Sequence, residues 1–251
     1  MSYVFPSGFK LPSIRWGNPL QYLFCWFLIT LFIVLSFILT VLFNQGRLDM
    51  AMSILQGHLT RDFTPQRQFF AFFCLANTFC LIFSALIAIG SEYGWRGFFF
   101  LHLLPLGKKK AALLSGLCWG IWYSPLILVG DYSQGHSLFW IPWSGKDPWY
   151  MSDGVYYQHN LLIGFLCKIL FCTLLGFILC WIYSLTGNIV MTCFSYAVFE
   201  QMVPLGYIMV RDVNVMTGGP EGLIGSGILL LIALILYFFI DWDKFPLFCK
   251  D

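Results

Sequence analysis

The sequence predicts an all-α fold in which a single domain, residues 1–251, forms a bundle of about six membrane-spanning helices. Two observations predict this class. Of the 251 residues, 59% are hydrophobic and 10% are charged, whereas an ordinary soluble domain carries about 25% charged residues. The apolar residues also gather in runs of about 20, the length of helix that crosses the hydrocarbon core of a bilayer. These properties exclude a soluble enzyme and a nucleic-acid-binding protein, and the net charge of +2 indicates no strongly charged partner.

Six segments are predicted to span the membrane, and the fifth is a span even though Glu200, Gln201 and Pro204 interrupt its apolar run. The six predicted spans are residues 20–43, 69–89, 111–129, 161–185, 188–210 and 222–242. A further apolar stretch, residues 93–106, is too short at about 14 residues to cross alone. It is predicted to continue the second helix or to lie as a helix at the membrane surface.

The positive charges near the ends of the spans predict the orientation. With the N-terminus inside, eight Lys and Arg residues lie on the inner side and five on the outer side, so both termini are predicted to be inside. The run Lys108–Lys110, directly before a span, carries most weight. The external loop 130–159 is then rich in Trp, Tyr and Pro, and forms either an aromatic belt at the interface or a cap over a cavity.

Ionisable residues inside membrane spans indicate function or pairing, because an isolated charge is costly there. Glu92 and Arg96 are four residues apart and therefore share one face of a helix, where they are predicted to form an ion pair. Lys168 and Glu200 lie at similar depths, about 12 and about 15 Å from the outer ends of neighbouring spans. They are predicted to pair as well. The alternative is that Lys168 extends outward to the interface and Glu200 is protonated.

No metal ion, disulfide framework or cofactor is predicted. The nine cysteines have no CxxC spacing and mostly lie in apolar runs. None of the four histidines lies deep in a span. Gly116 and Gly120 form a GxxxG motif, which predicts close approach of another helix.

Three stretches resemble the signatures of one family. Residues 91–98, Ser-Glu-Tyr-Gly-Trp-Arg-Gly-Phe, resemble a signature of two glutamates followed by three residues, Arg and Gly. Residues 119–130 resemble a signature in which His follows an aromatic residue, and residues 196–200 resemble one in which Asn follows His after three residues. The resemblance covers about residues 87–201 and is to the CAAX protease and bacteriocin-processing family of intramembrane proteases. Its Gly-Trp-Arg-Gly core is typical of a bacterial branch, which implies a bacterial cytoplasmic membrane.

The resemblance also implies where a catalytic site would lie. In active family members the first glutamate activates water, the two histidines bind or polarise it, and the asparagine stabilises the oxyanion. At these four positions the chain has Ser91, Tyr123, Tyr196 and Glu200. The second glutamate and the arginine are kept as Glu92 and Arg96, to which the resemblance assigns a structural role.

Three functions are compatible with this pattern. The first is a pseudoprotease, surrounded by membrane lipid, that binds a transmembrane or lipidated peptide or a membrane-protein partner in its helical cavity. Hydrolysis needs a base and an oxyanion donor, and tyrosine, with a pKa of about 10, is a poor base at neutral pH. The second is a divergent active endopeptidase that uses Glu92 or Glu200 with the tyrosines. The third is a carrier of a lipid or small molecule whose path includes Lys168 and Glu200.

Overall fold

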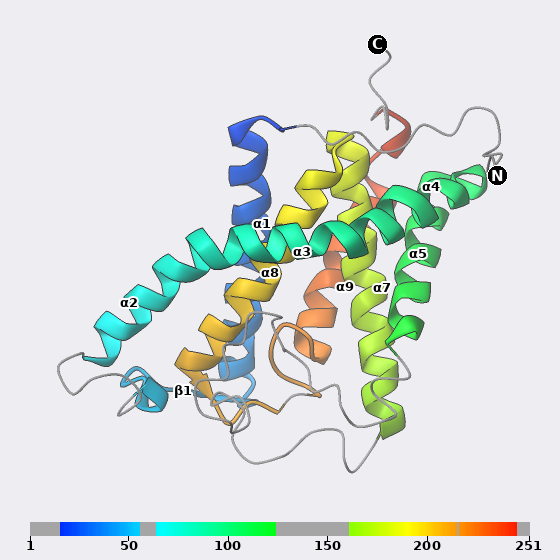
Figure 1. Cartoon of the computed structure of the whole chain (residues 1–251). Helices are drawn as coiled ribbons and strands as arrows, with labels where there is room; N and C mark the ends of the chain where they lie inside the picture. The colour runs from blue at the N-terminus through cyan, green and yellow to red at the C-terminus, as the bar shows by residue number, and fades with distance from the viewer. Residues whose placement is uncertain (1–15, 56–63, 124–160, 215, 245–251) are drawn as a thin grey trace.

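The computed structural model describes residues 16–55, 64–123, 161–214 and 216–244 (Figure 1). In these residues the fold is all-α apart from one two-residue ladder. Its helices and strands, in chain order, are α1 (Pro19–Leu42), β1 (Arg47–Leu48), α2 (Pro65–Leu75), α3 (Leu81–Glu92), α4 (Phe100–Leu103), α5 (Lys108–Trp122), α7 (Leu161–Thr186), α8 (Ile189–Met209), β2 (Val210–Arg211) and α9 (Leu223–Phe238).

Helices α2, α3 and α4 form one continuous helix, Pro65–Leu106, of 42 residues. Two π-helical segments, η2 (Ala76–Cys80) and η3 (Tyr93–Phe99), and a final 3₁₀ turn, η4 (Leu104–Leu106), complete it. At 1.5 Å per residue an α-helix of this length would extend about 60 Å, roughly twice the hydrocarbon thickness of a bilayer. It crosses the other helices obliquely in Figure 1. Of the two predictions for residues 93–106, continuation of the second helix is therefore confirmed.

Four helices in the described residues are long and apolar enough to cross a membrane, and α9 is a shorter apolar helix of 16 residues. The four are α1, the continuous helix Pro65–Leu106, α7 from Ile163 onward, and α8. The six predicted spans are thus only partly reproduced. Helix α5 has 15 residues and begins with three lysines, and the predicted continuation of this span through residues 124–129 lies outside the described residues.

Local sequence explains where these helices begin. The side chain of Asn18 caps α1 and forms a capping box with Gln21, and Pro19 occupies the first turn, where its missing N–H is not needed. Thr64 and Pro65 start α2 in a similar way. Between α7 and α8, Gly187 adopts a φ of 61°, which allows the sharp turn into the Asn188 cap of α8.

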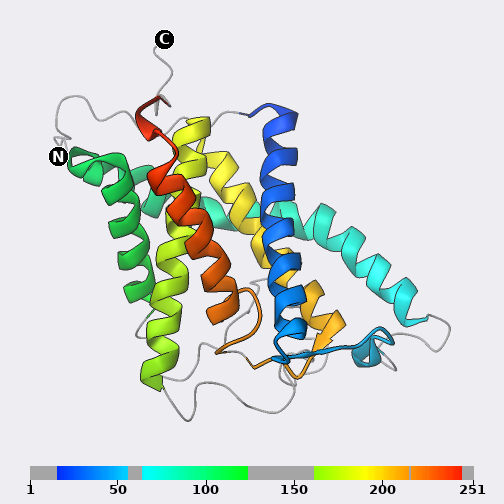
Figure 2. The ribbon, with the colours of Figure 1, turned by 180° about the vertical axis from the view of Figure 1, so that it is seen from behind.

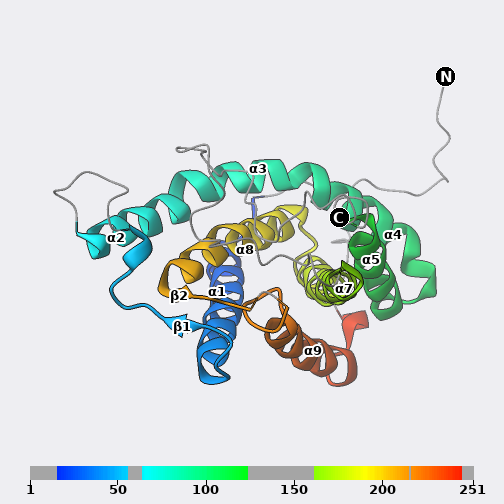
Figure 3. The same ribbon diagram turned by 90° about the horizontal axis from the view of Figure 1, so that it is seen from below.

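Helices α7 and α8 form the centre of the bundle. Helix α8 packs against α1 and α3, and α7 packs against α5 and α9. The view in Figure 3 shows the long helix along one side of this pair and α1 and α9 along the other. Figure 2, seen from behind, accordingly has α1 and α9 in front. The polar residues of α7 and α8 therefore lie inside the protein, away from lipid.

The predicted GxxxG contact is made within the chain, between α5 and α7. A Cβ atom on Gly116 would lie 2.5 Å from the carbonyl oxygen of Thr173, and one on Gly120 would lie 2.7 Å from the Cα of Ile169. The two backbones can approach this closely only because both positions lack a side chain. The third glycine of the contact, Gly176 of α7, faces Gly116.

We expect Gly116→Ala to destabilise the protein by about 1–3 kcal/mol, because the added methyl group overlaps the backbone of α7. Gly90→Ala is the matched control, since a Cβ there meets nothing within 4 Å. This control is expected to be neutral or to stabilise α3 by up to about 1 kcal/mol. Thermal unfolding of both variants in detergent measures the difference. Equal unfolding temperatures for the two variants would contradict the assignment of this contact.

Candidate functional site

The first polar cluster of the bundle is the predicted ion pair between Glu92 and Arg96. Arg96 Nη1 donates to Glu92 Oε1 at 2.8 Å, and the two side chains are 1% and 0% exposed. The guanidinium carbon of Arg96 also lies 4.3 Å from the ring centroid of Trp119, in a cation–π contact. The prediction made from the four-residue spacing is confirmed.

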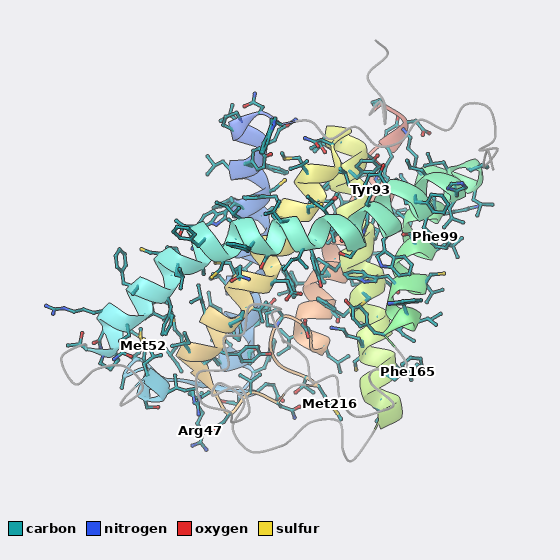
Figure 4. The ribbon with its side chains drawn as sticks, in the orientation of Figure 1. Arg47, Met52, Tyr93, Phe99, Phe165 and Met216 are labelled. Carbon is teal, nitrogen blue, oxygen red and sulfur yellow. The ribbon has the colours of Figure 1, made fainter. Side chains whose placement is uncertain are left out.

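Arg96 lies within the π-helical segment η3, whose first and last residues, Tyr93 and Phe99, are labelled in Figure 4. The wider turn of a π-helix changes which side chains face inward beyond this point. Ser91, one residue before Glu92, is exposed on the outer side of α3, and its hydroxyl donates to the carbonyl oxygen of Ala88 at 3.1 Å. Glu92, not Ser91, therefore faces the interior of the bundle.

A second polar cluster surrounds a small cavity between α5, α7, α8 and the loop before α9. About 10 Å³ of this cavity is open to the centre of a water molecule, which is close to the minimum that one water needs. Its polar lining comes from three helices and one loop, and consists of Tyr123, Lys168, Tyr196, Glu200 and Glu221. The polar cavity defined by these five residues is the candidate functional site.

Lys168 is paired in this cavity with Glu221. Its Nζ lies 3.5 Å from Oε2 of Glu221, and the side chains are 5% and 7% exposed. The sequence predicted Glu200 as the partner of Lys168, and the structure corrects this partner to Glu221. Glu200 lines the same cavity as Lys168 and Glu221. The pairing follows from burial, because the ammonium group needs a close counter-charge once it is removed from water.

Glu221 was missed because its position depends on the loop between α8 and α9. Residues 218–222 are all buried, and this stretch reads Gly-Gly-Pro-Glu-Gly. Gly219 adopts a φ of 72°, and its N–H donates to Thr40 Oγ1 of α1 at 2.8 Å. The glycines thus let the loop fold back into the bundle, where it presents Glu221 to α7. The signal available in sequence was a second acidic residue at the start of an apolar span.

The two tyrosines of the cavity, Tyr123 and Tyr196, lie next to Glu200 and Trp119. Tyr196, Tyr123 and Glu200 all lie in the lining of this cavity. The ring of Trp119 lies 5.8 Å from that of Tyr196 and 6.0 Å from that of Tyr123, between centroids. Because Arg96 stacks on the same indole, Trp119 separates the Glu92–Arg96 pair from the polar cavity.

The structure therefore brings together three of the five predicted family-site positions. Tyr123, Tyr196 and Glu200 line the polar cavity, Glu92 lies beyond Trp119, and Ser91 faces outward. His102 is exposed and contacts the carbonyl oxygen of Phe98, while the other three histidines lie outside the described residues. Within the described ranges, no three His, Cys, Asp or Glu side chains gather as metal ligands. The cavity as described offers hydroxyl groups, two carboxylates and one ammonium group.

Long apolar helices around a buried polar cavity define an integral membrane protein. Residues 72–202, just over half of the chain, match the family described as Type II CAAX prenyl endopeptidase Rce1-like. The chain belongs to this family, which confirms the family predicted from the three signatures. No curated protein and no solved structure matches the chain.

A double-mutant cycle tests the pairing of Lys168. We expect Lys168→Met and Glu221→Gln each to destabilise the protein by about 3–5 kcal/mol, because each leaves a buried partner uncompensated. The double variant is expected to recover most of this loss. The exposed pair Lys244–Asp241, with N and O 4.0 Å apart, is the reference and should contribute no more than about 1 kcal/mol. A larger coupling of Lys168 to Glu200 than to Glu221 would contradict the observed pairing.

Proposed function

We propose that this protein is a catalytically inactive member of the Rce1-like family, a pseudoprotease that binds a membrane peptide or a membrane-protein partner. One observation carries the proposal: the positions that supply the base and the oxyanion donors in the family are occupied here by Ser91, Tyr123, Tyr196 and Glu200. Three of these residues join Lys168 and Glu221 around a cavity with room for about one water.

The chemistry of this cavity supports the proposal. General acid–base catalysis and oxyanion stabilisation each contribute on the order of 10² to 10⁴ in rate. Neither tyrosine replaces an imidazole as a base, and Ser91 lies on the outer face of α3. Glu221 pairs with Lys168, and Tyr196 lines the same cavity as Glu200. Among the described residues, the lining of the cavity thus holds no imidazole base and no side-chain amide donor.

The size of the cavity bears on how a peptide would bind. A space for one water does not admit a peptide backbone or a prenyl group. Binding in the helical cavity therefore requires α5, α7 and α8 to move apart, or the Lys168–Glu221 pair to open. We further propose six membrane spans with both termini inside a bacterial cytoplasmic membrane. In support, Lys108 at the start of α5 donates to the carbonyl oxygen of Trp242, just after α9, at 2.7 Å.

The first test is cleavage. Purified wild-type protein is expected not to cleave a fluorogenic prenylated CAAX peptide. Its background cleavage rate should equal that of the double variant Glu200→Gln/Glu221→Gln. An active member of the family serves as the positive control and should be faster by about 10⁴-fold or more, the product of one base and one oxyanion donor. Wild-type cleavage above the rate of the double variant would contradict the proposal. A further variant tests whether the family residues restore activity. It combines four substitutions: Ser91→Glu, Tyr123→His, Tyr196→His and Glu200→Asn.

The second test is binding without cleavage. A prenylated CAAX peptide carrying a photoactivatable group is expected to cross-link near the polar cavity and to be recovered whole by mass spectrometry. A photoreactive amino acid placed at Tyr123 should capture the same peptide, whereas one at Leu231, which is 64% exposed on α9, should not. Equal capture from both positions would show non-specific partition into the micelle and would count against a binding site.

A divergent active protease remains the second candidate because two carboxylates, Glu200 and Glu221, line one water-sized cavity. Two carboxyl groups that share a proton can act as acid and base, as in aspartic proteases. The same cleavage assay separates the candidates: in an active protease of this kind, Glu200→Gln alone would abolish cleavage. Glu92→Gln would then act through stability, because Trp119 lies between Glu92 and the cavity.

A further inference from the structure

A second, larger hollow lies on the lipid-facing side of the bundle, away from the polar cavity. This apolar groove has a volume of about 400 Å³ and runs between α1, α2 and α8. Val34 and Ile38 of α1, Phe73 of α2 and Leu205 of α8 are among its lining residues. The volume lies in the range of ligand pockets, about 300–1,000 Å³. Because its lining residues are almost all apolar, the groove is suited to a hydrocarbon chain.

The two-stranded ladder closes one end of the apolar groove. Leu48 of β1 pairs with Val210 of β2, and both line the groove. The next pair of the ladder is Arg47 with Arg211. Because side chains alternate along a strand, these two arginines project from the opposite face of the ladder, beyond the end of the groove. Figure 4 shows Arg47 at this outer edge of the bundle.

Two like charges directly opposite on paired strands repel each other, so this arrangement favours an anion between them. In the part of the chain that the structure describes, no carboxylate oxygen lies within 4.0 Å of either guanidinium group. One nitrogen of Arg211, Nη1, is buried without a hydrogen-bond partner among these residues. The arginine pair therefore has an unused donor, and neither arginine is in ion-pair contact with a carboxylate of the described residues.

The nearby acid, Asp49, is engaged within its own turn. Its carboxylate accepts hydrogen bonds from the N–H of Ala51 at 3.1 Å and from the N–H and hydroxyl of Ser53. These bonds, the Ser53 hydroxyl foremost, hold the pKa of Asp49 below its usual range, with a smaller contribution from the charge of Arg211. Asp49 is thus directed at Ser53 and leaves Arg211 available.

We propose that the apolar groove and the arginine pair form one binding site for an anionic phospholipid. An acyl chain lies in the groove against α1, α2 and α8, and the head-group phosphate accepts hydrogen bonds from Arg47 and Arg211. Guanidinium groups match phosphate oxygens in charge and geometry. The charge of the arginines selects this occupant over a zwitterionic lipid or an uncharged apolar helix. The site is separate from the polar cavity and does not rest on the proposed pseudoprotease function.

Native mass spectrometry of the delipidated full chain, titrated with phosphatidylglycerol or with phosphatidylcholine of the same acyl chains, tests the site. Wild-type protein is expected to prefer phosphatidylglycerol. Arg47→Gln/Arg211→Gln should reduce this preference by about 30-fold, equivalent to about 1 kcal/mol for each basic residue. Lys110→Gln/Lys244→Gln, which removes two exposed charges elsewhere on the chain, is the matched control and should keep the preference.

The groove is tested separately on α1. Val34 and Leu31 are 46% and 41% exposed, but only Val34 is among the lining residues of the groove. Val34→Trp is expected to weaken binding of both lipids, and Leu31→Trp to leave it unchanged. The proposal is overturned if the two tryptophan variants bind alike, or if the arginine and lysine double variants retain the same preference. A dimer cross-linked through Val34→Cys that persists in excess phosphatidylglycerol would also overturn it, because a second copy would then fill the groove.

Discussion

The pairing of Lys168 with Glu221 is the constraint on which the interior of this protein depends. A charge removed from water inside a helical bundle is tolerated only beside a counter-charge. Lys168 belongs to α7, the central helix, and Glu221 reaches it only because the loop before α9 folds back into the bundle. That return fixes the loop against Thr40 of α1 and sets where α9 begins. One ion pair thus connects the start of the last helix to the centre of the fold.

A single aromatic side chain, Trp119, organises the rest of the polar interior. Arg96 stacks on its indole, and the rings of Tyr123 and Tyr196 pack near it. The side chain of Trp119 therefore lies between two buried ion pairs, Glu92–Arg96 and Lys168–Glu221. Trp119 can reach α7 and α8 because α5 lies very close to α7 at Gly116 and Gly120. The polar cavity stays small for the same reason.

The sequence predicted those parts of the structure that depend on local spacing. Helices α1, α7 and α8 follow from apolar runs long enough to cross a bilayer, and the Glu92–Arg96 pair follows from a spacing of one helical turn. The partner of Lys168 could not be predicted in this way, because Glu221 is 53 positions away and is positioned by glycine turns. The π-helical segment η3 could not be predicted either, because its two glycines, Gly94 and Gly97, do not by themselves distinguish a π-helix from an α-helix. The outward position of Ser91 follows instead from its neighbour Glu92, whose side chain points inward to Arg96.

The distribution of family-like and divergent residues now has a physical interpretation. Glu92 and Arg96, which match the family signature, form a pair with almost no exposure, and removing either partner would leave a buried charge at a cost of about 3–5 kcal/mol. The divergent positions Tyr123, Tyr196 and Glu200 are instead half-buried at a cavity edge, where a hydroxyl or carboxyl group can be satisfied by its neighbours. Loss of selection for hydrolysis would leave the first set fixed by stability and free the second set to change. The pattern seen in this chain is the one that an inactive scaffold predicts, because its two kinds of position differ in folding energy and not only in chemistry.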